Sequence, residues 1–367
     1  MLRLQRTLRT VSAVGIGFNI TTSAANAAGP LVTPFTTRNV SNSSLANNTV
    51  YGIYASGNTI YAATNDGLSI STNGGTSFTS SLSGKVVRGL FVDGSNVYAA
   101  TSAEGLAIST DGGANFTYKT TTVGGLGNNS TYSAFANGSS VYVGTLSSSN
   151  NGLSISTDGG ASFTGTLNGE TVRGVYAVGS TIYAATNSNG LKISTDGGAT
   201  FTTTKTVSDG LGSNNMLGIY ASGSTIYAAT NNGLSISTNG GSSFTNTLNA
   251  NTVYSAFASG GNIYAGTLTG LKVSTDGGAT YTTYTTANGL GNNTVRGVYT
   301  SGSTIYAATS GGGVSITQLA PSPSSSSSSV PGPLPVLGAC AVFSWSRRLR
   351  RRLHSRTTVQ SAAGRKA

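Results

Sequence analysis

The chain has 367 residues, including 52 glycines, and only 8% are charged, but 17 tyrosines and 11 phenylalanines are enough for a packed core. The formal net charge of +11 is carried by the two ends, because nine basic residues balance nine acidic residues between positions 30 and 330. This balance excludes a nucleic-acid-binding surface in the folded part, which would need clustered positive charge to release counterions.

Cysteine and histidine each occur once, at Cys340 and His354, both near the C-terminus. A single cysteine excludes an internal disulfide. The position of the histidine excludes a His-dependent catalytic triad or a His-ligated metal site inside the fold. The sequence also lacks dinucleotide-binding, P-loop and calcium-loop motifs, so we expect neither a cofactor nor a metal.

Residues 1–28 are predicted to be a secretory signal peptide. A start with three arginines precedes an apolar stretch, 11–20, and small residues follow up to Ala27. A basic start, an apolar centre and an Ala-x-Ala end are typical of such leaders. The protein is therefore expected to be exported.

Between residues 29 and 321 one sequence unit occurs seven times, at intervals of 37 to 44 residues. Its landmark is a segment of the form Ile/Val-Tyr-Ala/Val-Ala/Gly-Thr, with the tyrosine at positions 61, 98, 142, 183, 227, 264 and 306. Alternating segments and glycine-bearing turns around each landmark predict four strands per unit. Four-stranded units at this period are typical of β-propeller blades.

The seventh unit ends near residue 320, before its fourth strand. A matching segment stands at the start of the repeat region, where 34–37 and 47–50 resemble 280–283 and 292–295. The N-terminal strand is therefore expected to complete the last blade and close the ring, which removes a free sheet edge. The predicted fold is an all-β, seven-bladed β-propeller, and a parallel β-helix or an open solenoid is the alternative.

Six of the seven units contain a hairpin of the form Ser-x-Asp/Asn-Gly-Gly followed by an aromatic residue. This pattern resembles the Asp-box, in which the Asp or Asn side chain accepts hydrogen bonds from turn amides and glycine adopts positive φ. The stretch 288–299 also resembles the repeat of two-component-regulator propellers. Asp-box propellers include sialidases, other glycoside hydrolases, sortilin-like receptors and a photosystem II assembly factor, so the resemblance implies blades rather than one function. The Asp-box positions are Asn73, Asp111, Asp158, Asp196, Asn239 and Asp276.

The carboxylates do not follow the pattern of a glycosidase, which needs two of them at a defined separation. Of the nine acidic residues in the folded part, four are Asp-box residues and four others sit in turns. Glu170 is the one acidic residue without such an assignment, and we expect it to begin a first strand. In a sialidase it would serve only as the partner of the tyrosine nucleophile. Since no second carboxylate is left unassigned, no catalytic residue is predicted.

One position varies among the seven first strands, which line the channel of a propeller. It precedes a Gly or Ser near each strand start, so its seven side chains are expected to form one ring at the channel mouth. Arginine offers a planar fork for carboxylate, sulfate or phosphate, and tyrosine offers a stacking face with a hydroxyl. We therefore expect a site for an anionic saccharide or an acidic peptide, or, alternatively, side chains that only fill the channel. The ring consists of Tyr51, Arg88, Tyr132, Arg173, Leu217, Tyr254 and Arg296, and all but Leu217 are candidate ligand-binding residues.

The C-terminal region is predicted to be a sorting tail. A serine-rich linker, 322–330, leads to a Pro-Gly-Pro-Leu-Pro segment, a short apolar stretch and an arginine cluster. This order resembles the PEP-CTERM sorting signal in its cyanobacterial variant, which implies an exosortase-type processing enzyme and transient or permanent inner-membrane anchoring, with the arginines on the cytoplasmic side. Residues 353–367 are expected to be a basic disordered extension. The signal spans 331–352, and its characteristic residues are Pro331, Gly332, Pro333, Arg347, Arg348, Arg350, Arg351 and Arg352.

The sequence therefore favours a non-catalytic, monomeric propeller that is exported to the cell envelope, the cell surface or the extracellular matrix and acts as a binding or structural module. Its partners would be the processing enzyme, the membrane and an acidic polysaccharide or peptide, but not nucleic acid. One alternative is an Asp-box glycoside hydrolase of the sialidase or glucanase type. Another is an assembly factor for a membrane complex, resembling the photosystem II assembly propeller.

Overall fold

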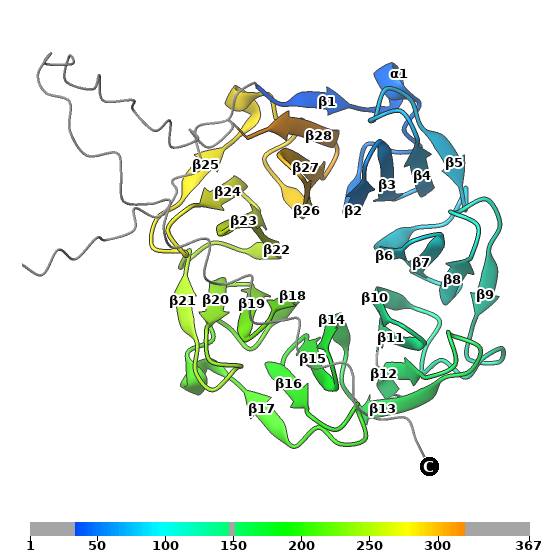
Figure 1. Cartoon of the computed structure of the whole chain (residues 1–367), viewed down its shortest axis with the longest axis vertical. Coiled ribbons are helices and arrows are strands. Elements are labelled where there is room, and N and C mark those ends of the chain that lie inside the picture. Colours follow the sequence, from blue (N-terminus) through cyan, green and yellow to red (C-terminus); the bar gives the residue numbers. More distant parts are fainter. Residues whose placement is uncertain (1–33, 147–150, 320–367) are drawn as a thin grey trace, which may run out of the picture. The chain divides into compact units, whose positions relative to one another are not determined.

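The computed structural model describes residues 34–146 and 151–319, so the predicted signal peptide, linker, sorting tail and basic extension lie outside the described residues. The described strands form seven antiparallel four-stranded sheets around one central channel (Figure 1). Blades are numbered 1 to 7, starting with the blade whose innermost strand is β2. The fold is the predicted seven-bladed propeller, not a β-helix or an open solenoid.

The strands of each blade follow one another from the channel to the rim. The innermost strands are β2 (Val50–Ser56), β6 (Val87–Asp93), β10 (Thr131–Asn137), β14 (Val172–Val178), β18 (Met216–Ser222), β22 (Val253–Ser259) and β26 (Val295–Ser301). The second strands are β3 (Thr59–Thr64), β7 (Asn96–Thr101), β11 (Ser140–Thr145), β15 (Thr181–Thr186), β19 (Thr225–Thr230), β23 (Asn262–Thr267) and β27 (Thr304–Thr309). The third strands are β4 (Gly67–Ser71), β8 (Leu106–Ser109), β12 (Asn151–Ser156), β16 (Leu191–Ser194), β20 (Gly233–Ser237), β24 (Gly270–Ser274) and β28 (Gly313–Gln318). The outer strands are β5 (Thr79–Ser81), β9 (Thr117–Lys119), β13 (Thr164–Asn168), β17 (Thr203–Lys205), β21 (Thr245–Thr247), β25 (Thr282–Tyr284) and, for blade 7, β1 (Thr36–Arg38).

Three short helical segments lie in the connections between blades. They are the α-helix α1 (Val40–Ser43) and the 3₁₀ turns η1 (Val207–Asp209) and η2 (Thr286–Asn288). Over residues 34–146 and 151–319, no helix has the length and apolar character needed to cross a membrane.

The hydrophobic core is divided into seven clusters, each formed by two neighbouring blades. The tyrosine of the second strand is buried in six blades and partly buried in blade 5, as its alternation with small residues predicted. One cluster joins the last blade to the first, because Val50 and Ile53 of β2 pack with Tyr306 and Ala308 of β27. Each blade therefore depends on both neighbours to cover its apolar faces.

The ring closes through the N-terminal strand, as predicted. Strand β1 pairs antiparallel with β28, with Thr36 opposite Ile316 and Arg38 opposite Val314. The amide of Phe35 also donates to the carbonyl of Asn288 in the connection from blade 6, at 2.9 Å. Closure gives blade 7 the same four strands as the other blades and covers the edge of β28.

A threonine ends the second strand of every blade and fixes the turn that follows. Its buried hydroxyl donates to a carbonyl at the start of the third strand or just before it, at 2.7–2.9 Å, as from Thr230 to Gly233. Because a buried carbonyl is costly to leave without a donor, this bond explains why the same residue type recurs seven times. The seven residues are Thr64, Thr101, Thr145, Thr186, Thr230, Thr267 and Thr309.

Substituting Thr230→Val removes this hydroxyl and keeps the shape of the side chain. We expect the free energy of unfolding, measured by urea denaturation, to fall by about 1–3 kcal/mol. The matched control is Thr245→Val at the exposed first position of β21, which should change it by less than about 0.5 kcal/mol. Equal losses at both positions would show that the buried hydrogen bond is not the cause.

The hairpins between the third and fourth strands of blades 1 to 6 share one set of hydrogen bonds. In blade 2, the Asp111 carboxylate accepts from the Ser109 hydroxyl at 2.7 Å and from the Asn115 amide at 2.9 Å. In blades 1 and 5, Asn73 and Asn239 accept the corresponding bonds through Oδ1. The aspartate and asparagine side chains therefore accept hydrogen bonds within their own turns.

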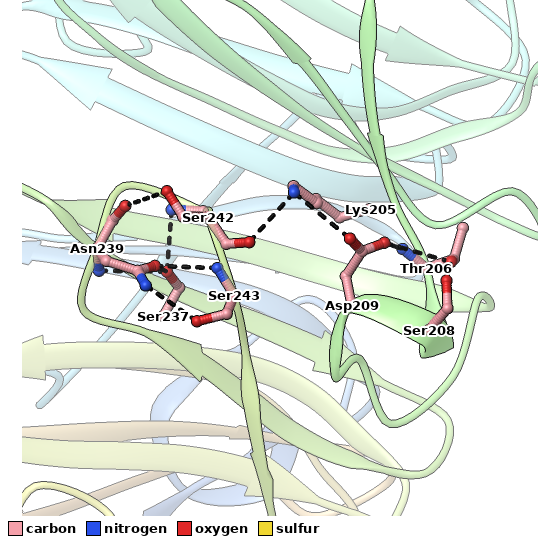
Figure 2. A network of polar contacts seen from close by, with 9 residues as sticks. Lys205, Thr206, Ser208, Asp209, Ser237, Asn239, Ser242 and Ser243 are labelled. Atoms are coloured by element: carbon pink, nitrogen blue, oxygen red, sulfur yellow. Dashed lines mark hydrogen bonds and ion pairs between the residues drawn. The ribbon is translucent and has the colours of Figure 1, made fainter.

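Side chains of the outer strands reach the hairpin of the next blade. Figure 2 shows Lys205, at the end of β17, between Asp209 at 3.4 Å and the Ser242 carbonyl of the blade 5 hairpin at 3.2 Å. Lys119 of β9 donates in the same way to the Ala161 carbonyl of blade 3, at 3.2 Å. These contacts tie neighbouring blades together at the rim.

The lowered pKa values of the hairpin aspartates predict how the stability of the fold changes at acidic pH. Hydrogen bonds from the Asn115 amide and the Thr280 hydroxyl lower the pKa of Asp111 and Asp276, respectively, to about 2. A pKa lowered in the folded state gives stability that is present above the unfolded value of about 3.9 and is lost as pH falls through the folded pKa. The thermal midpoint of the wild type should therefore fall as pH is lowered from 4 to about 2.

A variant with all four hairpin aspartates changed to asparagine, the residue that blades 1 and 5 use, should lose less of its thermal midpoint over the same pH range. The converse variant, Asn73→Asp with Asn239→Asp, should lose more. Identical declines in the three proteins would contradict this assignment. The four aspartates are Asp111, Asp158, Asp196 and Asp276.

Candidate functional site at the channel mouth

Every innermost strand carries one extra residue opposite its partner strand, which is a β-bulge. In blade 1, Val50 lies opposite Thr64 and Gly52 opposite Ala63, so Tyr51 is the extra residue. The same irregularity occurs in the other six blades. A bulge bends its strand and re-aims the side chain of the extra residue. The bulge residues are the seven members of the predicted ring: Tyr51, Arg88, Tyr132, Arg173, Leu217, Tyr254 and Arg296.

The residue after each bulge is glycine or serine because neighbouring innermost strands come close together there. A Cβ on Gly89 would lie 2.5 Å from the carbonyl oxygen of Tyr132 in the next blade. Blade 3 has Ser133 at this position, and the residue opposite on β11 is Gly144, where most blades have alanine. In blade 3 the larger residue on the innermost strand is thus compensated by a smaller residue on the second strand, and the spacing of the ring is preserved.

The seven bulge residues line one cavity of about 690 Å³ at the channel mouth. Asn65 and Ser102 contribute to its lining, and the walls include the apolar Ile53, Leu90 and Val175. The volume lies within the range of about 300–1,000 Å³ typical of small-ligand sites. The bulge side chains therefore surround an open space rather than fill it.

Each arginine of the ring lies against tyrosine rings of neighbouring blades. The guanidinium carbon of Arg88 is 4.5 Å from the ring centre of Tyr132, and that of Arg173 is 5.9 Å from the same ring. On the other side, the guanidinium carbon of Arg296 is 4.9 Å from Tyr254 and 5.6 Å from Tyr51. Cation–π contacts of this kind hold the arginine planes while leaving N–H donors for a ligand.

The positive charge of the cavity is not compensated by acidic residues. Of the residues described as lining the cavity, none is Asp or Glu. In the ion pairs described for residues 34–146 and 151–319, the basic partner is always a lysine and never a ring arginine. These pairs are Lys85–Glu104, Lys192–Glu170 and Lys205–Asp209. Three arginines in a concave site with low-dielectric walls focus a positive potential that attracts anions.

A second ring, of aromatic residues, lies deeper along the same strands. Neighbouring ring centres in six contacts are 4.3–5.2 Å apart. Burial raises the pKa of Tyr176 to about 12, with the nearby Tyr220 adding to the effect, so the Tyr176 hydroxyl stays protonated at neutral pH. The seven bulge residues are called the upper ring from here on, and this second ring is called the lower ring. It consists of Tyr54, Phe91, Phe135, Tyr176, Tyr220, Phe257 and Tyr299.

The acidic residues of the described chain do not line the cavity. The expectation that Glu170 begins a first strand is wrong, because β14 starts at Val172. The Glu170 carboxylate lies 3.5 Å from Lys192 Nζ and accepts a hydrogen bond from Asn189 at 2.9 Å, so it is committed to local contacts. The hairpin aspartates lie at the opposite end of the blades, because strand direction alternates from the channel outwards. Over the described residues, no group of three or more His, Cys, Asp or Glu side chains is placed to hold a metal.

The sequence identified the members of the ring but not the bulge that orients them. The repeated Gly or Ser after the variable position is the signal that marks it, since glycine within a strand often accompanies a bulge or a close backbone approach. The sorting-signal residues from Pro331 to Arg352 lie outside the described part of the chain.

No protein-family model and no curated protein matches this chain. Solved structures do resemble it. The extracellular domain of a hybrid two-component system from B. thetaiotaomicron has a TM-score of 0.67 at 19% identity, over 80% of this chain and 42% of that one. This chain thus spans less than half of that domain.

Two further structures have the same fold over most of this chain. YCF48, solved with a D1 peptide, has a TM-score of 0.59 at 13% identity and covers 81% of this chain and 99% of its own. A GH74 enzyme from Niastella koreensis has a TM-score of 0.50 at 22% identity, over 79% of this chain and 43% of that one. At these identities the likeness shows the propeller fold, which an extracellular two-component-system domain, a GH74 enzyme and YCF48 share.

Replacing all three ring arginines by glutamine tests whether they stabilise the fold or serve a ligand. The lost cation–π contacts, about 0.5–1 kcal/mol each, are offset by relief of repulsion between three like charges, so the free energy of unfolding should change by less than about 1.5 kcal/mol. Added salt should stabilise the wild type more than this variant, because salt screens the repulsion. Urea denaturation at low and high salt measures both effects. A loss above about 3 kcal/mol would identify the arginines as structural filling.

Proposed function

We propose that this chain is a non-catalytic, exported binding module that captures an anionic polysaccharide at the channel mouth. The observation that carries the proposal is the uncompensated set of three arginines, interleaved with three tyrosines around a cavity of about 690 Å³. Guanidinium forks suit carboxylate and sulfate groups, and tyrosine rings suit the faces of sugars. Outside this ring the folded part carries six basic and nine acidic residues, a net charge of −3, so the cavity is its main anion-attracting feature.

The proposed location rests on the two ends of the chain. Residues 1–28 resemble a secretory signal, and 331–352 resemble a PEP-CTERM sorting signal, which would bring an exosortase-type enzyme as a processing partner. The mature propeller would then be held at the cell surface or released into the extracellular matrix. The extracellular two-component-system domain of the same fold is in keeping with such a location.

Glycoside hydrolysis is not favoured, because the cavity lining has tyrosine and arginine but no described carboxylate to act as acid, base or nucleophile. An acidic peptide partner is the second candidate, since arginine forks also bind peptide carboxylates. YCF48, the neighbour solved with a D1 peptide, makes an assembly role of this type worth testing alongside the polysaccharides.

The test compares binding by the full chain with two matched variants that each remove three positive charges. The site variant carries Arg88→Ala, Arg173→Ala and Arg296→Ala, and the control carries Lys85→Ala, Lys192→Ala and Lys272→Ala. The probes are polygalacturonate, dextran sulfate, polyglutamate and neutral dextran. All three proteins share the same basic tail, so differences between them report on the cavity.

We expect the wild type and the lysine control to bind both acidic polysaccharides, and the site variant to lose at least about tenfold in affinity. Neutral dextran should not bind. Tighter binding of polyglutamate than of either polysaccharide would instead favour the peptide partner. Equal binding by all three proteins would contradict a ligand site at the channel mouth.

A further inference from the structure

The upper ring divides into two chemically unlike halves. One half, in blades 2 to 4, is an Arg88–Tyr132–Arg173 group, in which both guanidinium carbons lie within 5.9 Å of the centre of one tyrosine ring. The other half, in blades 6, 7 and 1, has a single guanidinium, that of Arg296, beside two tyrosine rings. Leu217 of blade 5 separates the halves on one side, so the cavity carries two charges in one half and one in the other.

Arg173 is the ring arginine with the least committed donors. The Nε atom of Arg173 is buried and has no hydrogen-bond partner among the described residues. The other two ring arginines each donate one long hydrogen bond, Arg88 to the Ser130 hydroxyl at 3.5 Å and Arg296 Nε to the Ser310 hydroxyl at 3.4 Å. A buried donor without a partner is costly, and ligand-binding sites are among the places where such donors are retained.

The geometry of two forks on one tyrosine ring favours a particular anionic group. A carboxylate has two oxygens in one plane, and a single guanidinium fork satisfies both. A sulfate or phosphate ester presents three terminal oxygens that point to different corners of a tetrahedron. Two guanidinium groups that approach from the blades on either side of Tyr132 match that arrangement, whereas the single fork of Arg296 between two ring faces matches a carboxylate-bearing sugar ring.

We propose that the Arg88–Tyr132–Arg173 half is a subsite for a sulfate or phosphate ester, so that this propeller selects esterified over merely carboxylated polysaccharides. This inference rests on the proposed function of the same cavity and adds the substituent that is recognised. The two esters share one chemistry and are separated by pH. A phosphate monoester gains charge through its second pKa of about 6, whereas a sulfate ester keeps one charge throughout.

The experiment uses one polymer backbone with four chemistries: dextran sulfate, dextran phosphate, carboxymethyl dextran of equal substitution, and unmodified dextran. The full chain is compared with two charge-preserving variants, Arg173→Lys in the proposed subsite and Arg296→Lys in the other half. A lysine keeps the charge but loses the fork, so each variant removes only the geometry. Dissociation constants are measured at pH 5 and pH 8, and thermal melting checks that both variants are folded.

We expect the wild type to prefer an ester-bearing dextran over carboxymethyl dextran by about tenfold or more. Arg173→Lys should abolish the preference by weakening binding of the ester-bearing dextrans more than that of carboxymethyl dextran, whereas Arg296→Lys should weaken all anionic probes and keep the preference. Tightening of dextran phosphate binding between pH 5 and pH 8, with dextran sulfate unchanged, identifies phosphate-type recognition, and tighter sulfate binding at both pH values identifies sulfate.

Equal affinity of the wild type for all anionic dextrans would overturn the ester subsite while leaving the anion-binding function intact. The ester subsite is also overturned if Arg173→Lys keeps the preference or if Arg296→Lys abolishes it. Binding that does not distinguish anionic from unmodified dextran would overturn the proposed function as well.

Discussion

The pairing of β1 with β28 is the constraint on which the site depends. Three residues from the N-terminal end of the described chain complete blade 7, and blade 7 can then pack against blade 1 through Val50, Ile53 and Tyr306. Only with this last interface in place does Arg296 of blade 7 reach Tyr51 of blade 1. The cavity is therefore a property of the closed ring, since no blade contributes more than one member of the upper ring.

The repeated unit separates what holds the fold from what makes the site. Three features recur with little change: the second-strand tyrosine, the threonine that ends that strand and the Ser-x-Asp/Asn hairpin. Each of them satisfies a packing or hydrogen-bonding requirement of one blade. The bulge position makes no such demand, since its side chain leaves the sheet. It is therefore free to differ between blades, and it carries the arginines whose charge no described carboxylate balances.

The sequence was sufficient to predict the seven blades, the closure by the N-terminal strand and the membership of the upper ring, because strand period, turn residues and repeat register are all local signals. It did not predict the bulges, since a bulge depends on how two strands pair and not on either strand alone. It also left open whether Tyr51, Arg88 and their equivalents fill the channel. That outcome depends on how side chains from seven different blades are placed around the channel, which no single strand specifies. The start of β14 was misplaced by two residues, so Glu170 lies in the connection before that strand, where it pairs with Lys192.

The central claim is that the three ring arginines hold an anionic ligand, and side-chain nuclear magnetic resonance of ¹⁵N-labelled arginine tests it most directly. Arg38, on the outer strand of blade 7, is an internal reference remote from the channel (Figure 1). On addition of a short dextran sulfate, we predict that the Nε–H signals of Arg88, Arg173 and Arg296 shift together with one affinity, while that of Arg38 stays in place. Shifts confined to Arg38 or to the arginines of 347–352, with the ring signals unchanged, would contradict the claim.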